Sequence, residues 1–208
     1  MKLTPCHLIA ALALLGFGAT SLAADKVTGN PDLAKPIVQE QCAACHGEDG
    51  NSPVPNFPNL AGQVIESIFA ELKAFKAEHR QSETMPAAIV ANLTDADLAN
   101  LALYFAAQIP KPATVTKPEL LDLGKKLYLN GNPDSGVPSC DGCHEEDGHG
   151  SPPRFPRLAG QNVEYTIDEF RQYAANQRQN GIKQMRTIAQ RLTAKEIEAL
   201  AQYIASMK

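Results

Sequence analysis

The chain has 208 residues, of which 44% are hydrophobic, 20% charged and 6% aromatic, and its formal net charge is −4. This length suits one or two domains, and the apolar fraction is large enough to form hydrophobic cores. General nucleic-acid binding is disfavoured, because proteins of that class usually carry a basic excess. A disulfide-rich scaffold is also disfavoured, since the chain has only five Cys.

Residues 1–23 are typical of a cleavable signal peptide. Lys2 provides a positive charge, residues 8–17 form an apolar core, and Ser21 and Ala23 are small residues at the positions that a signal peptidase recognises. The alternative is an uncleaved membrane anchor, because residues 8–24 approach the shortest length that spans a bilayer. Cleavage after Ala23 is the favoured interpretation. It predicts an exported, periplasmic protein and leaves peripheral membrane association open.

The remaining chain shows helical periodicity and no convincing strand. Apolar residues at helical spacing, or a capping motif, predict each helix. In chain order, helices are expected over residues 32–44, 65–75, 94–105, 119–129, 163–174 and 193–204. The start of the first is ambiguous because Pro36 lies inside it. The predicted fold class is therefore all-α.

An internal repeat divides the chain into two similar halves. Residues 55–63 read PNFPNLAGQ and residues 153–161 read PRFPRLAGQ, at an offset of 98. Similarity of this kind over half of the chain indicates two homologous domains. The proline-rich segment between them favours an extended linker. The predicted organisation is a first domain over residues 24–109, a linker over 110–118 and a second domain over 119–208.

The chain contains two copies of the motif Cys-x-x-Cys-His, the attachment signature of c-type haem. Composition alone predicts this motif about 0.003 times in a chain of this length. Two thiols at this spacing can each form a thioether with a haem vinyl group, and the following His can bind the iron. The motif residues are Cys42, Cys45 and His46 in the first copy and Cys140, Cys143 and His144 in the second. They predict two covalently bound haem c groups, each with one iron.

Other uses of these cysteines fit less well. A redox dithiol usually follows a strand–helix pattern, which is missing here, and a zinc site needs ligands at closer spacing than two pairs 98 residues apart. Simple disulfides remain an alternative in an oxidising compartment.

Each iron needs a sixth ligand or an open position, and the methionines offer one. Met85 lies 39 residues after the first motif histidine and Met185 lies 41 residues after the second, in each case before the last predicted helix. His/Met ligation is an established mode of haem binding, and the matched positions favour it here over simple core packing. We expect both methionines in loops over the distal haem faces. Met207 has no counterpart, His149 is too close to the second motif, and His79 is expected to be exposed.

Together, the two haem motifs, the two FPxLAGQ segments and the two matched methionines resemble the dihaem cytochrome c4 family. That family has two class I cytochrome c domains in one exported chain, each wrapped around one covalently attached haem. The resemblance implies that Cys42 and Cys45 hold the first haem. Its iron would bind His46 and Met85.

By the same resemblance, Cys140 and Cys143 hold the second haem, with His144 and Met185 on its iron. Class I cytochromes also use a proline carbonyl to accept the ring N–H of the iron-binding histidine. Pro58 and Pro156, each twelve residues after its motif histidine, occupy that position.

The second motif departs from the first in two places. Glu145 follows its histidine where Gly47 follows the first, and Met185 lacks the proline that follows Met85.

The ligand set implies electron transfer rather than catalysis. His and Met fill both axial positions, so a small-molecule substrate has no place on the iron, and thioether ligation raises the reduction potential. The resemblance implies a periplasmic carrier of single electrons from a quinol-oxidising complex to a terminal oxidase, with membrane respiratory complexes or other redox proteins as partners. The alternatives are a dihaem electron-accepting subunit of a flavin- or molybdenum-dependent dehydrogenase and, less favoured, a dihaem peroxidase.

Overall fold

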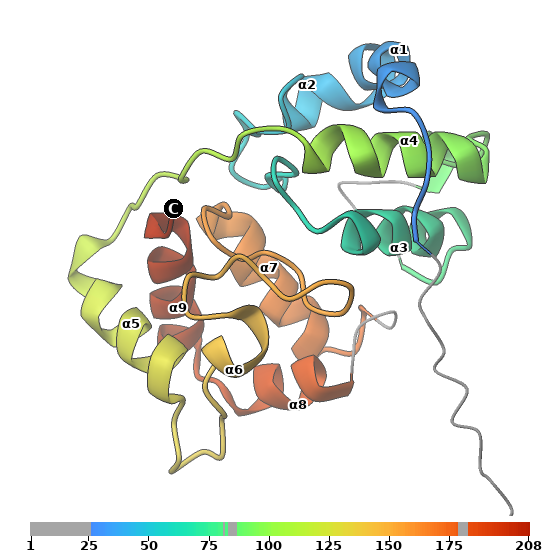
Figure 1. Ribbon diagram of the computed structural model, residues 1–208. Coiled ribbons are helices and arrows are strands. Elements are labelled where there is room, and N and C mark those ends of the chain that lie inside the picture. Colours follow the sequence, from blue (N-terminus) through green and yellow to red (C-terminus); the bar gives the residue numbers. More distant parts are fainter. Residues whose placement is uncertain (1–25, 81, 83–86, 179–182) are drawn as a thin grey trace, which may run out of the picture.

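The computed structural model describes residues 26–80, 82, 87–178 and 183–208, and the predicted signal peptide and Met85 lie outside this part of the chain. The described residues form helices and loops with two isolated bridges and no β-strand, which confirms the predicted all-α class. They fold into two halves joined by an extended segment (Figure 1). None of the helices in these ranges is long and apolar enough to cross a membrane.

The first half opens with one continuous helical run that changes type along its length. A 3-10 turn (Pro31–Ala34) leads into α1 (Lys35–Ile37), a π-helical turn (Val38–Cys42) and α2 (Ala43–His46). Asn30 caps this run by accepting from the backbone N–H of Asp32 at 3.0 Å. The predicted helix over 32–44 is thus present, and Pro36 is accommodated in the first turn of α1, where its missing N–H is tolerated.

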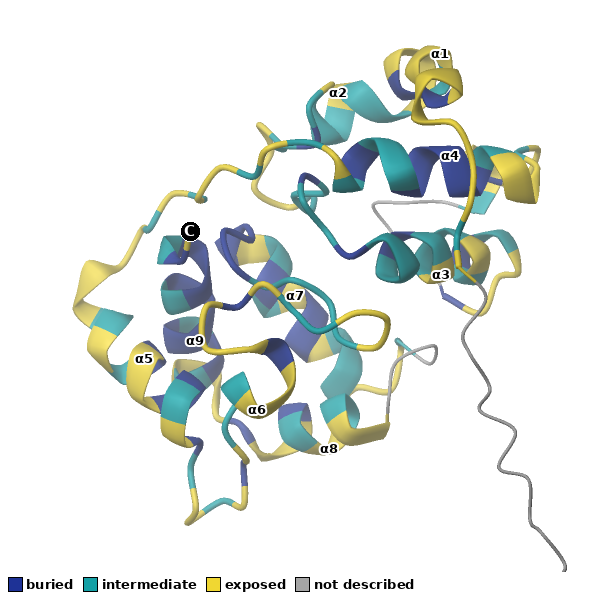
Figure 2. Ribbon diagram, in the orientation of Figure 1, coloured by how far each residue is buried: buried dark blue, intermediate teal, exposed yellow. Residues whose placement is uncertain are grey.

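Two longer helices complete the first half. α3 (Ile65–Lys76) packs against α4 (Asp95–Ala106), and a 3-10 turn (Ala87–Ile89) precedes α4. These two helices and the opening run together bury an apolar core, and α4 carries clear dark bands in Figure 2. The buried residues of this core are Ala34, Val38, Ile68, Leu101, Ala102 and Phe105.

The second half repeats this plan and has one α-helix more among the described residues. A 3-10 turn (Pro118–Leu120) starts α5 (Leu121–Asn130), followed by α6 (Asp141–His144), α7 (Val163–Ala174), α8 (Lys183–Arg191) and α9 (Ala194–Ser206). α9 packs against α5 and α7, and α8 packs against α7. The last helix of each half begins with the predicted capping box, in which Thr94 pairs with Asp97 and Thr193 with Glu196.

α8 was not predicted, and it corrects the expectation for Met185. This residue lies in a helix rather than in a loop. The signal was present in the sequence, because apolar residues recur at 185, 188, 189 and 192, the spacing of a helix with one buried face. The many polar residues between them obscured this stripe.

The two halves meet through α3, α7 and the loops that precede them. Four charged residues form a closed ring of ion pairs across this interface, in which each guanidinium contacts both carboxylates. The ring is internally symmetric, because its members are related by the 98-residue offset of the repeat. It consists of Glu71 and Arg80 from the first half and Glu169 and Arg178 from the second, and we call it the charged ring.

Candidate haem sites

The first motif lies where the opening helical run ends. Cys42 closes the π-helical turn, and Cys45 and His46 follow in α2. Gly47 then ends the helix with φ 74° and ψ 152°, a conformation that is essentially restricted to glycine. Both thiols are half-buried and free, and burial raises the pKa of Cys42 to about 11.

A proline carbonyl holds the histidine of this motif. Nδ1 of His46 lies 3.0 Å from the carbonyl oxygen of Pro58. A carbonyl can only accept, so Nδ1 carries the ring proton and Nε2 keeps its lone pair for a metal. The ring also meets Phe57 edge to face, with centroids 5.8 Å apart. Burial lowers the pKa of His46 in spite of the bond to Pro58, which favours the neutral imidazole that metals bind.

The second motif repeats this geometry. Nδ1 of His144 lies 2.9 Å from the carbonyl oxygen of Pro156, and the ring of Phe155 meets the imidazole with centroids 6.0 Å apart. Burial raises the pKa of Cys140 to about 12 and lowers that of His144. Cys140 and Cys143 are also free of disulfides. Both sites therefore present two thiols and one imidazole nitrogen.

The departure after the second motif does not change the backbone. Glu145 has φ 66° and ψ 158°, close to the conformation of Gly47 in the first half. A residue with a Cβ is strained in this region. Its carbonyl accepts a hydrogen bond from the buried hydroxyl of Tyr128 at 2.7 Å, which helps to hold the strained turn.

The structure shows where several methionines, and the histidines outside the two motifs, lie. Met185 is half-buried in α8 and packs against the core of the second half, while Met85 lies outside the described residues. Met207 is buried in the same core. His79 is exposed, as expected, and Nε2 of exposed His149 lies 2.8 Å from the carbonyl oxygen of Lys208.

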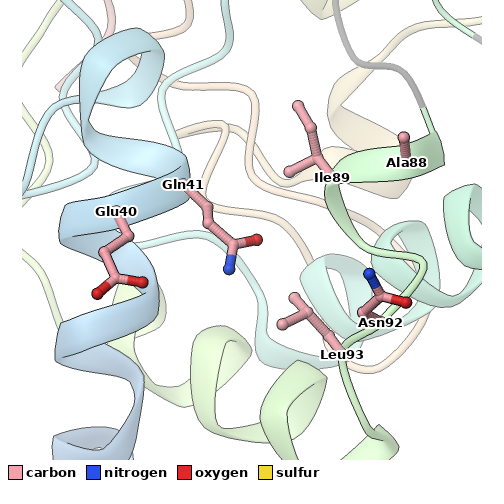
Figure 3. Close-up of a pocket in the computed structure, with 6 residues that line it drawn as sticks. All are labelled: Glu40, Gln41, Ala88, Ile89, Asn92 and Leu93. Carbon is pink, nitrogen blue, oxygen red and sulfur yellow. The ribbon is translucent and has the colours of Figure 1, made fainter.

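A pocket of about 380 Å³ opens beside the first motif (Figure 3). One wall is the π-helical turn that ends at Cys42, and the other is the segment from residue 88 to residue 93. Its lining residues are Glu40, Gln41, Ala88, Ile89, Asn92 and Leu93.

Sequence reasoning missed the polar contacts between the halves. The side chains of Gln63 and Gln161 reach across the interface to the backbone of Arg157 and Asn59, respectively. Both glutamines belong to the repeated PNFPNLAGQ and PRFPRLAGQ segments, so the repeat marked them without revealing their partner.

Comparison with known proteins places these sites in a family. The cytochrome c family profile matches the chain twice, at residues 32–107 and 121–208. Cytochrome c4 of Thiocapsa roseopersicina is 40% identical over 88% of this chain and 95% of that protein. The chain belongs to the dihaem cytochrome c4 family.

The fold comparison agrees with this family. The crystal structure of reduced recombinant cytochrome c4 from Pseudomonas stutzeri superimposes with a TM-score of 0.82, at 35% identity, over 87% of this chain and all of that one. A more distant relative is the thiosulfate dehydrogenase electron acceptor of Thiomonas intermedia, 28% identical over 97% of this chain and 92% of that protein. As a cytochrome c4, this chain carries two covalently bound haem c groups with iron and transfers electrons.

The described residues fit such a group. Free paired thiols next to an imidazole whose Nδ1 is already engaged form the donor set that haem c requires.

Proposed function

We propose that this cytochrome c4 is a periplasmic shuttle with two His/Met-ligated haems. Cys42 and Cys45 would hold the first haem, and His46 and Met85 would bind its iron. One observation supports this arrangement above the others: a proline carbonyl orients the imidazole of each motif through Nδ1.

By the same proposal, Cys140 and Cys143 hold the second haem, and His144 and Met185 bind its iron. The matched bond from His144 to Pro156 supports this second set.

The protein groups determine what kind of redox centre results. The bound haem supplies an iron that takes up and gives back one electron. The carbonyls of Pro58 and Pro156 make the imidazoles stronger donors and fix their rings. Methionine in the sixth position would raise the potential and leave no site for a small-molecule substrate, so we propose a carrier and not an enzyme.

The cellular setting is part of the proposal. A signal peptide over residues 1–23 would be removed on export, leaving domains over 24–109 and 119–208 with the linker 110–118. The partners would be membrane respiratory complexes, a quinol-oxidising complex as donor and a terminal oxidase as acceptor. Peripheral association with the membrane is compatible with this role.

Substitution of the methionine in the second domain tests the ligation. In Met185→Ala holoprotein, the near-infrared sulfur-to-iron absorption should fall to about half, because one of two thioether ligands is lost. Met207→Leu, a buried methionine outside the proposed ligand set, is the matched control and should retain the full band. An unchanged band in Met185→Ala would contradict the assignment.

The relative in Thiomonas intermedia supports a second candidate, an electron-accepting subunit of a dehydrogenase. A native pull-down from periplasmic extract, with thiosulfate-dependent haem reduction as the readout, separates the two functions. Reduction by thiosulfate only in the presence of a co-purifying catalytic chain would favour the subunit. Reduction by a quinol-oxidising membrane fraction without such a chain would favour the shuttle.

A further inference from the structure

The loop that supports the first motif histidine is held by the other half of the chain. The carbonyl of Phe57 accepts from the side-chain amide of Asn162 at 2.8 Å. The backbone of Asn59 pairs twice with the side chain of Gln161, donating at 2.8 Å and accepting at 3.0 Å. Pro58, whose carbonyl faces the histidine, lies between these two residues. Both of its neighbours are therefore anchored to the second half.

The matching loop of the second half is anchored to the first half on one side of its proline only. The backbone of Arg157 pairs with the side chain of Gln63, donating at 2.7 Å and accepting at 2.9 Å. On the other side of the second proline, the carbonyl of Phe155 accepts from Ser151 in its own loop. The residue that corresponds to Asn162 in the first half is Val64, whose side chain cannot donate.

These anchors are shielded from water. Asn162 is 8% exposed and Gln161 is 9% exposed, so their hydrogen bonds compete little with solvent. The Oε1 atom of Gln161 also accepts from the backbone N–H of Asn162 at 2.8 Å, which fixes the two side chains relative to each other. The ring of Phe57, whose carbonyl is anchored, contacts the imidazole of His46. A displacement of this loop would therefore change both the Nδ1–H hydrogen bond of His46 and the ring contact that orients its imidazole.

We propose that Asn162 and Gln161 are positioning residues for the first haem, acting across the domain interface. They fix the carbonyl of Pro58 and, through it, the strength of the Nδ1–H bond of His46. The donor strength of the imidazole, and with it the potential of the first iron, then depends on the docked second domain. The potential of the second iron depends less on the docked first domain, because only one neighbour of Pro156 is anchored to it. This inference rests on the proposed function, in which His46 binds the iron.

The test uses Asn162→Val, which installs the residue found at the matched position of the first half. Losing an anchor weakens the Nδ1–H bond of His46, makes the imidazole a poorer donor and disfavours the oxidised iron. At a fixed potential, the ratio of reduced to oxidised first haem should rise about threefold, or about 30 mV at 59 mV per tenfold. In the reduced holoprotein, the Nδ1–H proton resonance of His46 should move while that of His144 stays. Gln161→Ala should act in the same direction.

Gln63→Ala is the matched control, because it loosens the same interface from the other side. It should move the resonance of His144 and leave that of His46 in place. The positioning role is refuted if neither Asn162→Val nor Gln161→Ala changes the potential of the first haem and the Nδ1–H resonance of His46. It is also refuted if Gln63→Ala changes them equally, which would indicate general loosening of the interface. Wild-type protein whose iron lacks His46 as a ligand would instead refute the proposed function.

Discussion

Removal of one carboxylate from the charged ring should strongly destabilise the protein. Glu169 is 11% exposed and contacts both guanidinium groups of the ring, which are themselves 6% and 12% exposed. In Glu169→Gln, Arg80 and Arg178 keep one of the two carboxylates of the charged ring, that of Glu71. Loss of one partner from a buried ion pair costs about 3–5 kcal/mol, because it leaves an uncompensated charge away from water. We expect a loss of this size in the free energy of unfolding.

The symmetric substitution supplies the control. Glu71 is 28% exposed, so water can partly compensate its loss, and Glu71→Gln should cost less than Glu169→Gln. Combining Glu169→Gln with Arg80→Met restores the charge balance. The double variant should therefore be more stable than the sum of the single effects predicts, by about 1–3 kcal/mol.

Urea denaturation of the holoprotein, followed by far-ultraviolet circular dichroism, measures all of these free energies. A cost below about 1 kcal/mol for Glu169→Gln, typical of an exposed pair, would refute this account of the ring. Strict additivity in the double variant would also refute it.

Three further outcomes concern local structure. Glu145→Gly should stabilise the holoprotein by about 1 kcal/mol in urea denaturation, because it relieves a strained backbone; Gly47→Ala should destabilise it, since a Cβ there meets the carbonyl oxygen of Asn51 at 2.6 Å. A destabilising effect of Glu145→Gly, or no effect of Gly47→Ala on the free energy of unfolding, would count against the strain. Thr193→Ala removes an N-cap and should lower the free energy of unfolding by about 1 kcal/mol, and no change would mean that the cap is dispensable. Hydrogen bonds from the N-cap threonines hold the pKa values of Asp97 and Glu196 below their ordinary 3.8 and 4.5. Their contribution is present above those values and is lost as pH falls through the lower folded pKa. The free energy of unfolding should therefore decline below about pH 4.5, and Glu196→Gln, measured over the same pH range, should flatten the decline; an unaltered slope would contradict the assignment.

The sequence was most informative where local chemistry determines structure. Spacing alone predicted the long helices other than α8, the capping boxes at Thr94 and Thr193 and the two motif sites, because these depend on neighbours within a few residues. The contacts of Pro58 and Pro156 followed from the family resemblance and could not be derived from periodicity.

Features that depend on the docking of the two halves were not predictable. Glu71 and Arg80 look like ordinary surface charges in the sequence, and only the folded interface shows Glu71 paired with Arg178 and Arg80 paired with Glu169. The same holds for Asn162, whose partner lies 105 residues away along the chain. The helix around Met185 was missed because its apolar stripe is narrow and flanked by charge.

An anaerobic redox titration of the holoprotein, followed in the visible and near-infrared, tests the central claim most directly. The account predicts two one-electron transitions at high potential and a sulfur-to-iron band from both oxidised haems, as thioether ligation requires. A haem of low potential, or a high-spin haem that binds peroxide, would contradict the closed His/Met sites and favour an enzyme.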